Sequence, residues 1–144
     1  MMLILKKKFL KKIRYFDCHE KNVLIIDDNY EKINNLINLL KPYNLKIEIA
    51  HSYEDYEKKM YSGINWDLIL LDDMMPDSHK FDFLSFNDSE KSQSLENIKS
   101  LTNIDLPLVI MLTPSDSIEN MNGDYLIKPI KKDKLHGIIS KYLK

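Results

Sequence analysis

The chain has 144 residues and a mass of 17.1 kDa, which is the size of one ordinary domain. Hydrophobic residues make up 44% and charged residues 30%, so the chain can bury a core and does not have the composition of a disordered tail. The longest apolar run is about five residues, too short for a transmembrane helix. The single cysteine, Cys18, excludes an internal disulfide, which fits a reducing cytoplasm.

The charges are unevenly distributed along the chain. Residues 1–16 hold six basic side chains and no acidic one, and their apolar residues fall close to a helical period. The rest of the chain holds the other 15 basic residues and all 22 acidic ones, a net charge of −7, which disfavours direct DNA binding by this body. We expect residues 1–21 to be a basic amphipathic N-terminal extension. It is either a solvated leader helix or a helix that touches an acidic partner or a membrane surface through residues 2–16.

From residue 22 onward, short apolar strands alternate with helical stretches. The expected strands are, in chain order, residues 23–26, 45–50, 66–71, 106–112 and 124–127. The expected helices are 33–40, ended by Pro42, then 53–60, 89–101 and 131–143. This order predicts one α/β domain over residues 22–144, with a parallel sheet, right-handed crossovers and helices on both faces.

Polar side chains stand where four of these strands end. Asp27 and Asp28 follow the first strand, Asp72 the third, Thr113 the fourth and Lys128 the fifth. In open parallel sheets the ligand site lies outside the carboxyl ends of the strands, so these side chains are expected to converge.

The expected cluster has a definite chemistry. Three carboxylates that lie close together raise one another's pKa unless a cation joins them. A hard divalent cation with oxygen ligands fits such a group, which predicts Mg²⁺, whereas the four histidines are scattered and indicate no zinc site. A carboxylate, a metal, a hydroxyl and an ammonium group together predict an oxyanion or phosphoryl site.

Each of these residues also has an ordinary structural explanation. Asp28 with Glu31 can form a capping box at the start of the first helix. Asp72 can belong to a turn after its strand, Thr113 can cap a following helix, and Lys128 can be an exposed side chain before a turn proline. Their coincidence at neighbouring strand ends favours the joint site.

Four stretches carry a family resemblance. They are Val23-Leu24-Ile25-Ile26-Asp27-Asp28-Asn29, Asp67-Leu68-Ile69-Leu70-Leu71-Asp72-Asp73-Met74-Met75-Pro76, Leu112-Thr113, and Asp124-Tyr125-Leu126-Ile127-Lys128-Pro129. Over residues 22–144 the chain resembles a response-regulator receiver domain, and the wording of its motifs is most similar to receivers attached to hybrid histidine kinases. The resemblance implies a flavodoxin-like, doubly wound sheet of five strands in the order 2-1-3-4-5.

The resemblance also implies an acceptor and a metal. Asp72 would accept a phosphoryl group from a histidine of a kinase or of a histidine phosphotransfer protein. The ligands of Mg²⁺ would be the side chains of Asp27, Asp28 and Asp72 and the backbone carbonyl of Met74.

The remaining roles follow from the same resemblance. Thr113 and Lys128 would bind the phosphoryl oxygens, and Tyr125 would be the aromatic switch residue that turns inward. The protein would catalyse only its own phosphorylation and dephosphorylation, and would therefore not be an enzyme in the usual sense. It would act in the cytoplasm and signal by contact with a downstream protein that the sequence does not name.

The chain departs from the family pattern in three places. Pro114 has no backbone N–H where receivers usually offer one to the phosphoryl group, a loss of about 1.5–3 kcal/mol of stabilisation, although proline also suits a helix start. Lys128 follows Thr113 by only 15 positions, so the fourth helix is expected to be shortened. An insertion over residues 77–88 is expected either to cover itself with three phenylalanines or to present them to a partner; these are Phe81, Phe83 and Phe86.

These departures leave two other functions open. One is a degenerate, phosphorylation-independent interaction module, which Pro114 and the short fourth helix favour. The other is a small phosphatase or phosphotransferase with Asp72 as nucleophile. It is disfavoured because Met74 stands where an acid or base would activate water.

Overall fold

The computed structural model describes residues 13–77, 80, 108–114 and 125–144. Within them one five-stranded sheet has the order β2-β1-β3-β4-β5, and every neighbouring pair is parallel. The strands are β1 (Asn22–Ile26), β2 (Lys46–Ala50), β3 (Leu68–Asp72), β4 (Leu108–Thr113) and β5 (Tyr125–Ile127). The expected α/β class, the parallel sheet and its strand order are confirmed.

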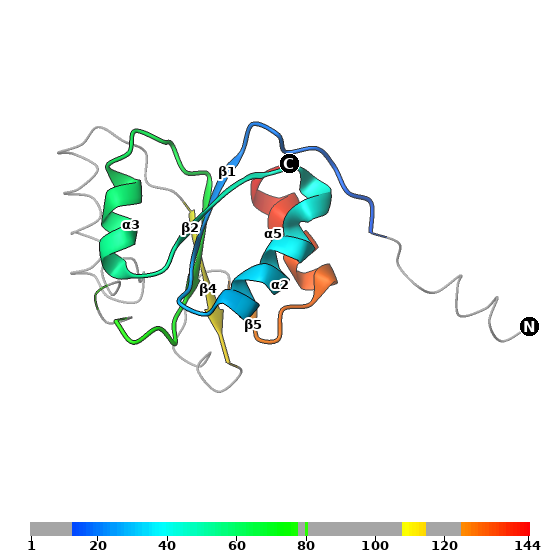
Figure 1. Ribbon diagram of the computed structural model, residues 1–144. Coiled ribbons are helices and arrows are strands. Elements are labelled where there is room, and N and C mark those ends of the chain that lie inside the picture. The colour runs from blue at the N-terminus through cyan, green and yellow to red at the C-terminus, as the bar shows by residue number, and fades with distance from the viewer. Residues whose placement is uncertain (1–12, 78–79, 81–107, 115–124) are drawn as a thin grey trace, which may run out of the picture.

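Helices cover both faces of the sheet. In the described ranges they are α2 (Tyr30–Leu40), the 3-10 turn η1 (Lys41–Tyr43), α3 (Tyr53–Met60) and α5 (Lys132–Tyr142). Figure 1 shows α2 and α5 together on one face and α3 on the other. This is the three-layer arrangement of a doubly wound sheet.

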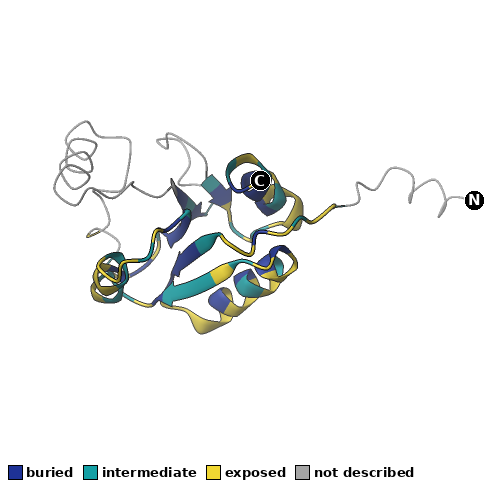
Figure 2. Cartoon of the chain, turned by 90° about the horizontal axis from the view of Figure 1, so that it is seen from above, coloured by how far each residue is buried: buried dark blue, intermediate teal, exposed yellow. Residues whose placement is uncertain are grey.

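The alternation of side chains along the strands divides the core in two. Val23 and Ile25 of β1 pack with α2 and α5, whereas Leu24 and Ile26 pack with α3. All of β3 is buried, as expected for a central parallel strand covered on both faces. In Figure 2 the strands in the middle of the sheet are dark, the edge strand β2 is mostly intermediate, and the outer sides of the helices are exposed. The sheet therefore forms a rigid base, and its strand ends can position reactive side chains.

Some element boundaries differ from the expectation. β3 begins at Leu68 and includes Asp72, although the apolar pattern predicted a strand from residue 66 that stopped before the aspartate. Trp66 precedes the strand and is buried against the α3 side, so its hydrophobicity reflects packing and not pairing. Pro42 lies within η1, which Asn44 ends in the left-handed conformation with φ of 57°.

The capping box expected at the start of α2 is not formed. The N-cap is Asn29, whose side-chain oxygen accepts a hydrogen bond from the Lys32 backbone N–H at 3.0 Å. Because the helix starts one residue later than a cap at Asp28 requires, the interpretation of Asp28 as N-cap is wrong. The exposed Asp28 carboxylate thus lies before the helix, beside the strand ends.

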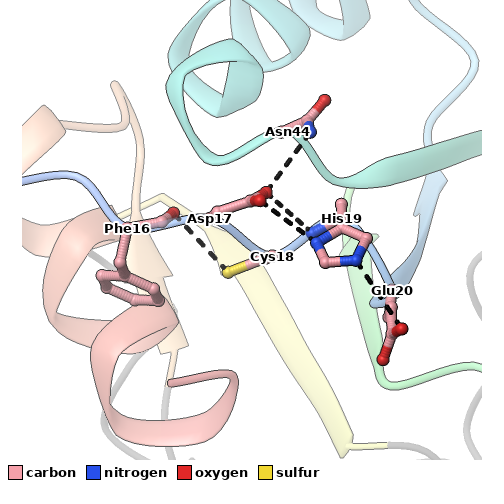
Figure 3. Close-up of polar contacts among 6 residues, drawn as sticks. All are labelled: Phe16, Asp17, Cys18, His19, Glu20 and Asn44. Carbon is pink, nitrogen blue, oxygen red and sulfur yellow. Dashed lines mark hydrogen bonds and ion pairs between the residues drawn. The ribbon is translucent and has the colours of Figure 1, made fainter.

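Residues 13–21, the described part of the chain before β1, pack on the domain without forming a helix. Residues 13–18 have no regular secondary structure, so the expected leader helix does not include Ile13 or Phe16. Cys18 is buried in the core, and its backbone N–H donates to the Tyr43 carbonyl oxygen at 2.7 Å. In Figure 3 the carboxylate of Asp17 links the segment to Asn44, whose side-chain amide donates to it at 3.3 Å.

Several expectations lie outside the described residues. They concern the leader over residues 1–12, the phenylalanines and nearly all of the insertion at 77–88, the helix at 89–101 and the shortened fourth helix. In the ranges that the structure does describe, no helix has the length and apolar composition that a membrane span requires.

Candidate functional site

Three aspartates meet at the carboxyl end of the sheet. Asp27 follows β1 directly, and Asp72 is the last residue of β3, the strand paired with β1. One carboxylate oxygen from each of Asp27, Asp28 and Asp72 lies within 4.8 Å of the others. Asp27 is 3% exposed and Asp72 2%, while Asp28 is exposed. The predicted convergence of these side chains is therefore present.

Asp27 is fixed by backbone contacts on both sides. Its N–H donates to the Ala50 carbonyl oxygen at 3.1 Å, and its Oδ1 accepts from the Asn29 N–H at 2.9 Å. Burial raises the pKa of Asp27, and the negative charge of Asp72 raises it further, against the lowering effects of the Asn29 N–H and of Lys128. Burial is the larger of these effects, so Asp27 is a carboxyl group for which ionisation is disfavoured mainly by its enclosure.

Lys128 supplies the positive charge at this end of the sheet. Its backbone N–H donates to the Thr113 carbonyl oxygen at 2.9 Å, which continues the register between β4 and β5. Its Nζ forms an ion pair with Oδ1 of Asp72. The same oxygen accepts from the Met74 N–H at 3.0 Å, in a tight turn after β3. The peptide bond between Lys128 and Pro129 is cis.

Thr113 is completely buried at the end of β4, and its hydroxyl does not point to Asp72. Its Oγ1 donates to Oδ2 of Asp73 at 2.7 Å and lies 3.3 Å from the Pro114 carbonyl oxygen. The other oxygen of Asp73, Oδ1, is buried and has no hydrogen-bond partner among the described residues. Thr113 is therefore at the expected strand end, but its proton is already used by a neighbouring carboxylate.

The donor set fits a hard divalent cation. Three carboxylates whose oxygens lie within 4.8 Å of one another are the kind of ligand that Mg²⁺ takes, and Asp28 is exposed to water. One ammonium group, that of Lys128, faces these three carboxylates among the described residues, so the cluster has room for a further positive charge. The cluster is thus compatible with metal binding.

Two further predicted residues lie nearby. Met74 is exposed, and its backbone lies in the turn after β3, where its N–H donates to Oδ1 of Asp72. Tyr125 is half-buried at the start of β5, opposite Met111. Its role as a switch, like that of the Met74 carbonyl as a ligand, stays a prediction.

Asp73 was expected at this strand end, although no role was predicted for it, and Asp77 was not singled out. Asp73 contacts Thr113, and Asp77 accepts a hydrogen bond from the Tyr53 N–H at 2.9 Å, which fastens the turn after β3 to the start of α3. Alternation along a strand places adjacent residues on opposite faces, so the pair Asp72 and Asp73 did not suggest a shared site. The sequence feature that could have indicated a role for Asp73 is a second acidic residue directly after the last residue of a strand.

Comparison with solved structures identifies the architecture. No family model matches the sequence, and no curated protein matches it. A co-crystal structure of a histidine phosphotransfer signaling protein from Saccharomyces cerevisiae with the receiver domain of its downstream response regulator matches with a TM-score of 0.61. The identity is 20%, and 85% of this chain and 88% of that chain are covered.

Two bacterial structures agree with this match. A putative response regulator from Chloroflexus aurantiacus has a TM-score of 0.62 at 20% identity, with 85% of this chain and 97% of that chain covered. The receiver domain of a Francisella response regulator has a TM-score of 0.58 at 25% identity, with 85% and 96% covered. The chain therefore has the fold of response-regulator receiver domains.

Proposed function

We propose that this chain is a phosphoacceptor receiver of a two-component or phosphorelay system, with Asp72 as the acceptor. The observation that carries the proposal is the set of charged side chains around Asp72. Its carboxylate lies at a strand end within 4.8 Å of oxygens of Asp27 and Asp28, and it is paired with the ammonium group of Lys128. Phosphoryl transfer depends on such positioning and charge stabilisation more than on covalent catalysis by the protein.

In the proposed reaction Asp72 attacks the phosphorus atom of a phosphohistidine. Its Oδ1 accepts from Met74 and Lys128, so we assign the attack to Oδ2. The new O–P bond forms as the P–N bond breaks, and the electron pair stays on the imidazole nitrogen, which takes up a proton. The product is an acyl phosphate on Asp72, and the donor histidine returns to its neutral form.

We assign the metal to the three aspartates, with the Met74 carbonyl as a further ligand. When bound there, Mg²⁺ would neutralise charge on the phosphoryl oxygens. Asp27, Asp28 and Asp72 would hold the ion and orient it, and the rigid ends of β1 and β3 fix their spacing.

Lys128 and Thr113 would then hold the phosphoryl group. Lys128 already contacts Oδ1 of Asp72, beside the attacking Oδ2, while the Thr113 hydroxyl would have to leave Asp73 to reach a phosphoryl oxygen. Tyr125 would turn inward into the space that the Thr113 side chain leaves. The response would be a shift in population between two packings of the ends of β4 and β5.

The proposed partners follow from the same chemistry. A histidine kinase or a histidine phosphotransfer protein would be the donor, and the yeast receiver that this fold matches is bound to a phosphotransfer protein. The proposal that the donor belongs to a hybrid histidine kinase system rests only on the similarity of the sequence motifs. The acceptor is consumed and restored in each cycle, so the protein would not be an enzyme, and it would act in the cytoplasm on a downstream protein.

A phosphorylation-independent interaction module is the second candidate. Pro114 offers no N–H beside the site, and the Thr113 hydroxyl is held by Asp73. Both features weaken the binding of a phosphoryl group, but neither changes the acceptor carboxylate or Lys128.

Intact mass after incubation with acetyl phosphate and Mg²⁺ tests the proposal. We expect the wild-type chain to gain one phosphoryl group and Asp72→Asn to gain none. Glu31→Gln is the control and should gain one, because it removes an exposed carboxylate of α2 and keeps the acceptor. No gain in the wild-type chain, with Mg²⁺ binding shown separately, would favour the phosphorylation-independent module.

A further inference from the structure

The Thr113 hydroxyl is committed to a carboxylate that is not the acceptor. Its Oγ1 is 2.7 Å from Oδ2 of Asp73, and the threonine has no exposed surface. A hydroxyl group carries one proton, so it cannot donate fully to Asp73 and to a phosphoryl oxygen at once. Any phosphoryl group on Asp72 that binds Thr113 must compete with Asp73 for this proton.

Asp73 depends on that hydrogen bond. Its backbone N–H donates to the Leu112 carbonyl oxygen at 3.2 Å, which fixes it beside the end of β4. Its Oδ2 accepts from Thr113, and its buried Oδ1 has no partner among the described residues. A hydrogen bond to an ionised group is stronger than one between neutral groups, and a carboxylate that loses its donor away from water is destabilised.

Pro114 makes the competition between Asp73 and a phosphoryl oxygen for the Thr113 hydroxyl more important. Because residue 114 has no N–H, the Thr113 hydroxyl and the Lys128 ammonium group are the side-chain donors found at the ends of β4 and β5 in the part of the chain that the structure describes. If Asp73 holds one of the two, the phosphorylated state loses a large share of its stabilisation.

We propose that Asp73 is a positioning residue that holds Thr113 in the resting arrangement and thereby opposes the phosphorylated state. This inference rests on the proposed function and adds to it a residue that sets how strongly the site holds a phosphoryl group. The carboxylate of Asp73 acts through Thr113 and does not touch the transferred group.

Beryllofluoride, which mimics a phosphoryl group on an aspartate, provides the test in the presence of Mg²⁺. We expect Asp73→Ala to bind it roughly tenfold more tightly than the wild-type chain, as loss of one charge-assisted competitor predicts. Asp73→Asn, which keeps the shape but not the charge, should give a smaller gain. Glu31→Gln, which removes an exposed carboxylate in the first turn of α2, is the control for net charge and should bind as the wild-type chain does.

A double-mutant cycle with Thr113→Val separates competition from charge repulsion. In the Thr113→Val background, Asp73→Ala should no longer tighten binding. The free energy of unfolding, measured in urea without beryllofluoride, should show a coupling between Asp73 and Thr113 that is independent of phosphorylation. Circular dichroism confirms that each variant is folded.

The outcomes are distinct. Equal affinity of the wild-type chain and both Asp73 variants would overturn the inference and leave the proposed function intact. An Asp73→Ala effect that persists without the Thr113 hydroxyl would also overturn it, because repulsion alone would then explain the gain. Failure of every chain to bind beryllofluoride would contradict the proposed function itself, and the inference would fall with it.

Discussion

The carboxyl group of Asp27 is nearly enclosed at the acidic end of the sheet, and its ionisation is unfavourable there. Burial raises its pKa above the ordinary value of 3.8, and the charge of Asp72 adds to the rise. A raised pKa in the folded state means that the native protein holds this proton more tightly than the unfolded chain does. The corresponding contribution to stability is complete below about pH 3.8 and is lost as the pH rises through the folded-state pKa.

We therefore predict that Asp27→Asn stabilises the metal-free protein at neutral pH by about 1 kcal/mol, the scale of a single substitution. Asparagine removes the charge and keeps an oxygen that can accept from the Asn29 N–H. The gain should shrink as the pH falls through the raised pKa of Asp27, because the wild-type carboxyl group then takes up a proton. Urea unfolding in a chelator at several pH values measures it. A variant that is less stable than the wild-type chain at pH 7 would contradict this reading of Asp27.

Single residues of the site were predictable to different degrees. Asp72 and Lys128 could be paired because both stand at strand ends that a parallel sheet brings together. The contact between Asp73 and Thr113 could not, because it depends on how the chain turns immediately after β3. In this turn the Met74 N–H donates a hydrogen bond to Asp72. Such a contact leaves no periodic pattern of apolar residues in the sequence.

At the scale of elements, the start of α2 connects the site to the fold. Asn29 caps the helix with an extended backbone, and its N–H also binds Asp27. We predict that Asn29→Ala lowers the free energy of unfolding by about 1 kcal/mol through loss of the cap. Asp28→Ala is the matched control, since Asp28 does not cap the helix, and it should not cause this loss. An equal loss in both variants would contradict the assignment of the cap to Asn29.

The helices and strands were predicted well where burial determines the pattern. β1 and β3 read as continuous apolar runs because both of their faces are covered, and α2 and α5 show their inward residues at helical spacing. The start of β3 was misplaced because Trp66 is apolar without being paired. The non-helical course of residues 13–18 was missed because their aromatic residues pack on Tyr43 and His136 and not along a helix face.

At the scale of the whole molecule, the metal site should link ligand binding to stability. A cation that binds only the folded state stabilises it by about 2.7 kcal/mol at a hundredfold excess over its Kd. We predict that Mg²⁺ raises the midpoint of thermal unfolding of the wild-type chain, and that lowering the pH through the raised pKa of Asp27 weakens this effect, because the ligands must be deprotonated. Asp28→Asn should lose most of the shift, while Glu31→Gln should keep it. Equal shifts in both variants would exclude the aspartate cluster as the site.

Location of the phosphoryl group is the measurement that tests the account most directly. After incubation with acetyl phosphate and Mg²⁺, reduction with borohydride converts an aspartyl phosphate to homoserine, which peptide mass spectrometry places in the sequence. The account predicts homoserine at Asp72 and at none of Asp27, Asp28 or Asp73. Homoserine at another aspartate, or none in a chain that binds Mg²⁺, would contradict the assignment of Asp72 as the phosphoacceptor.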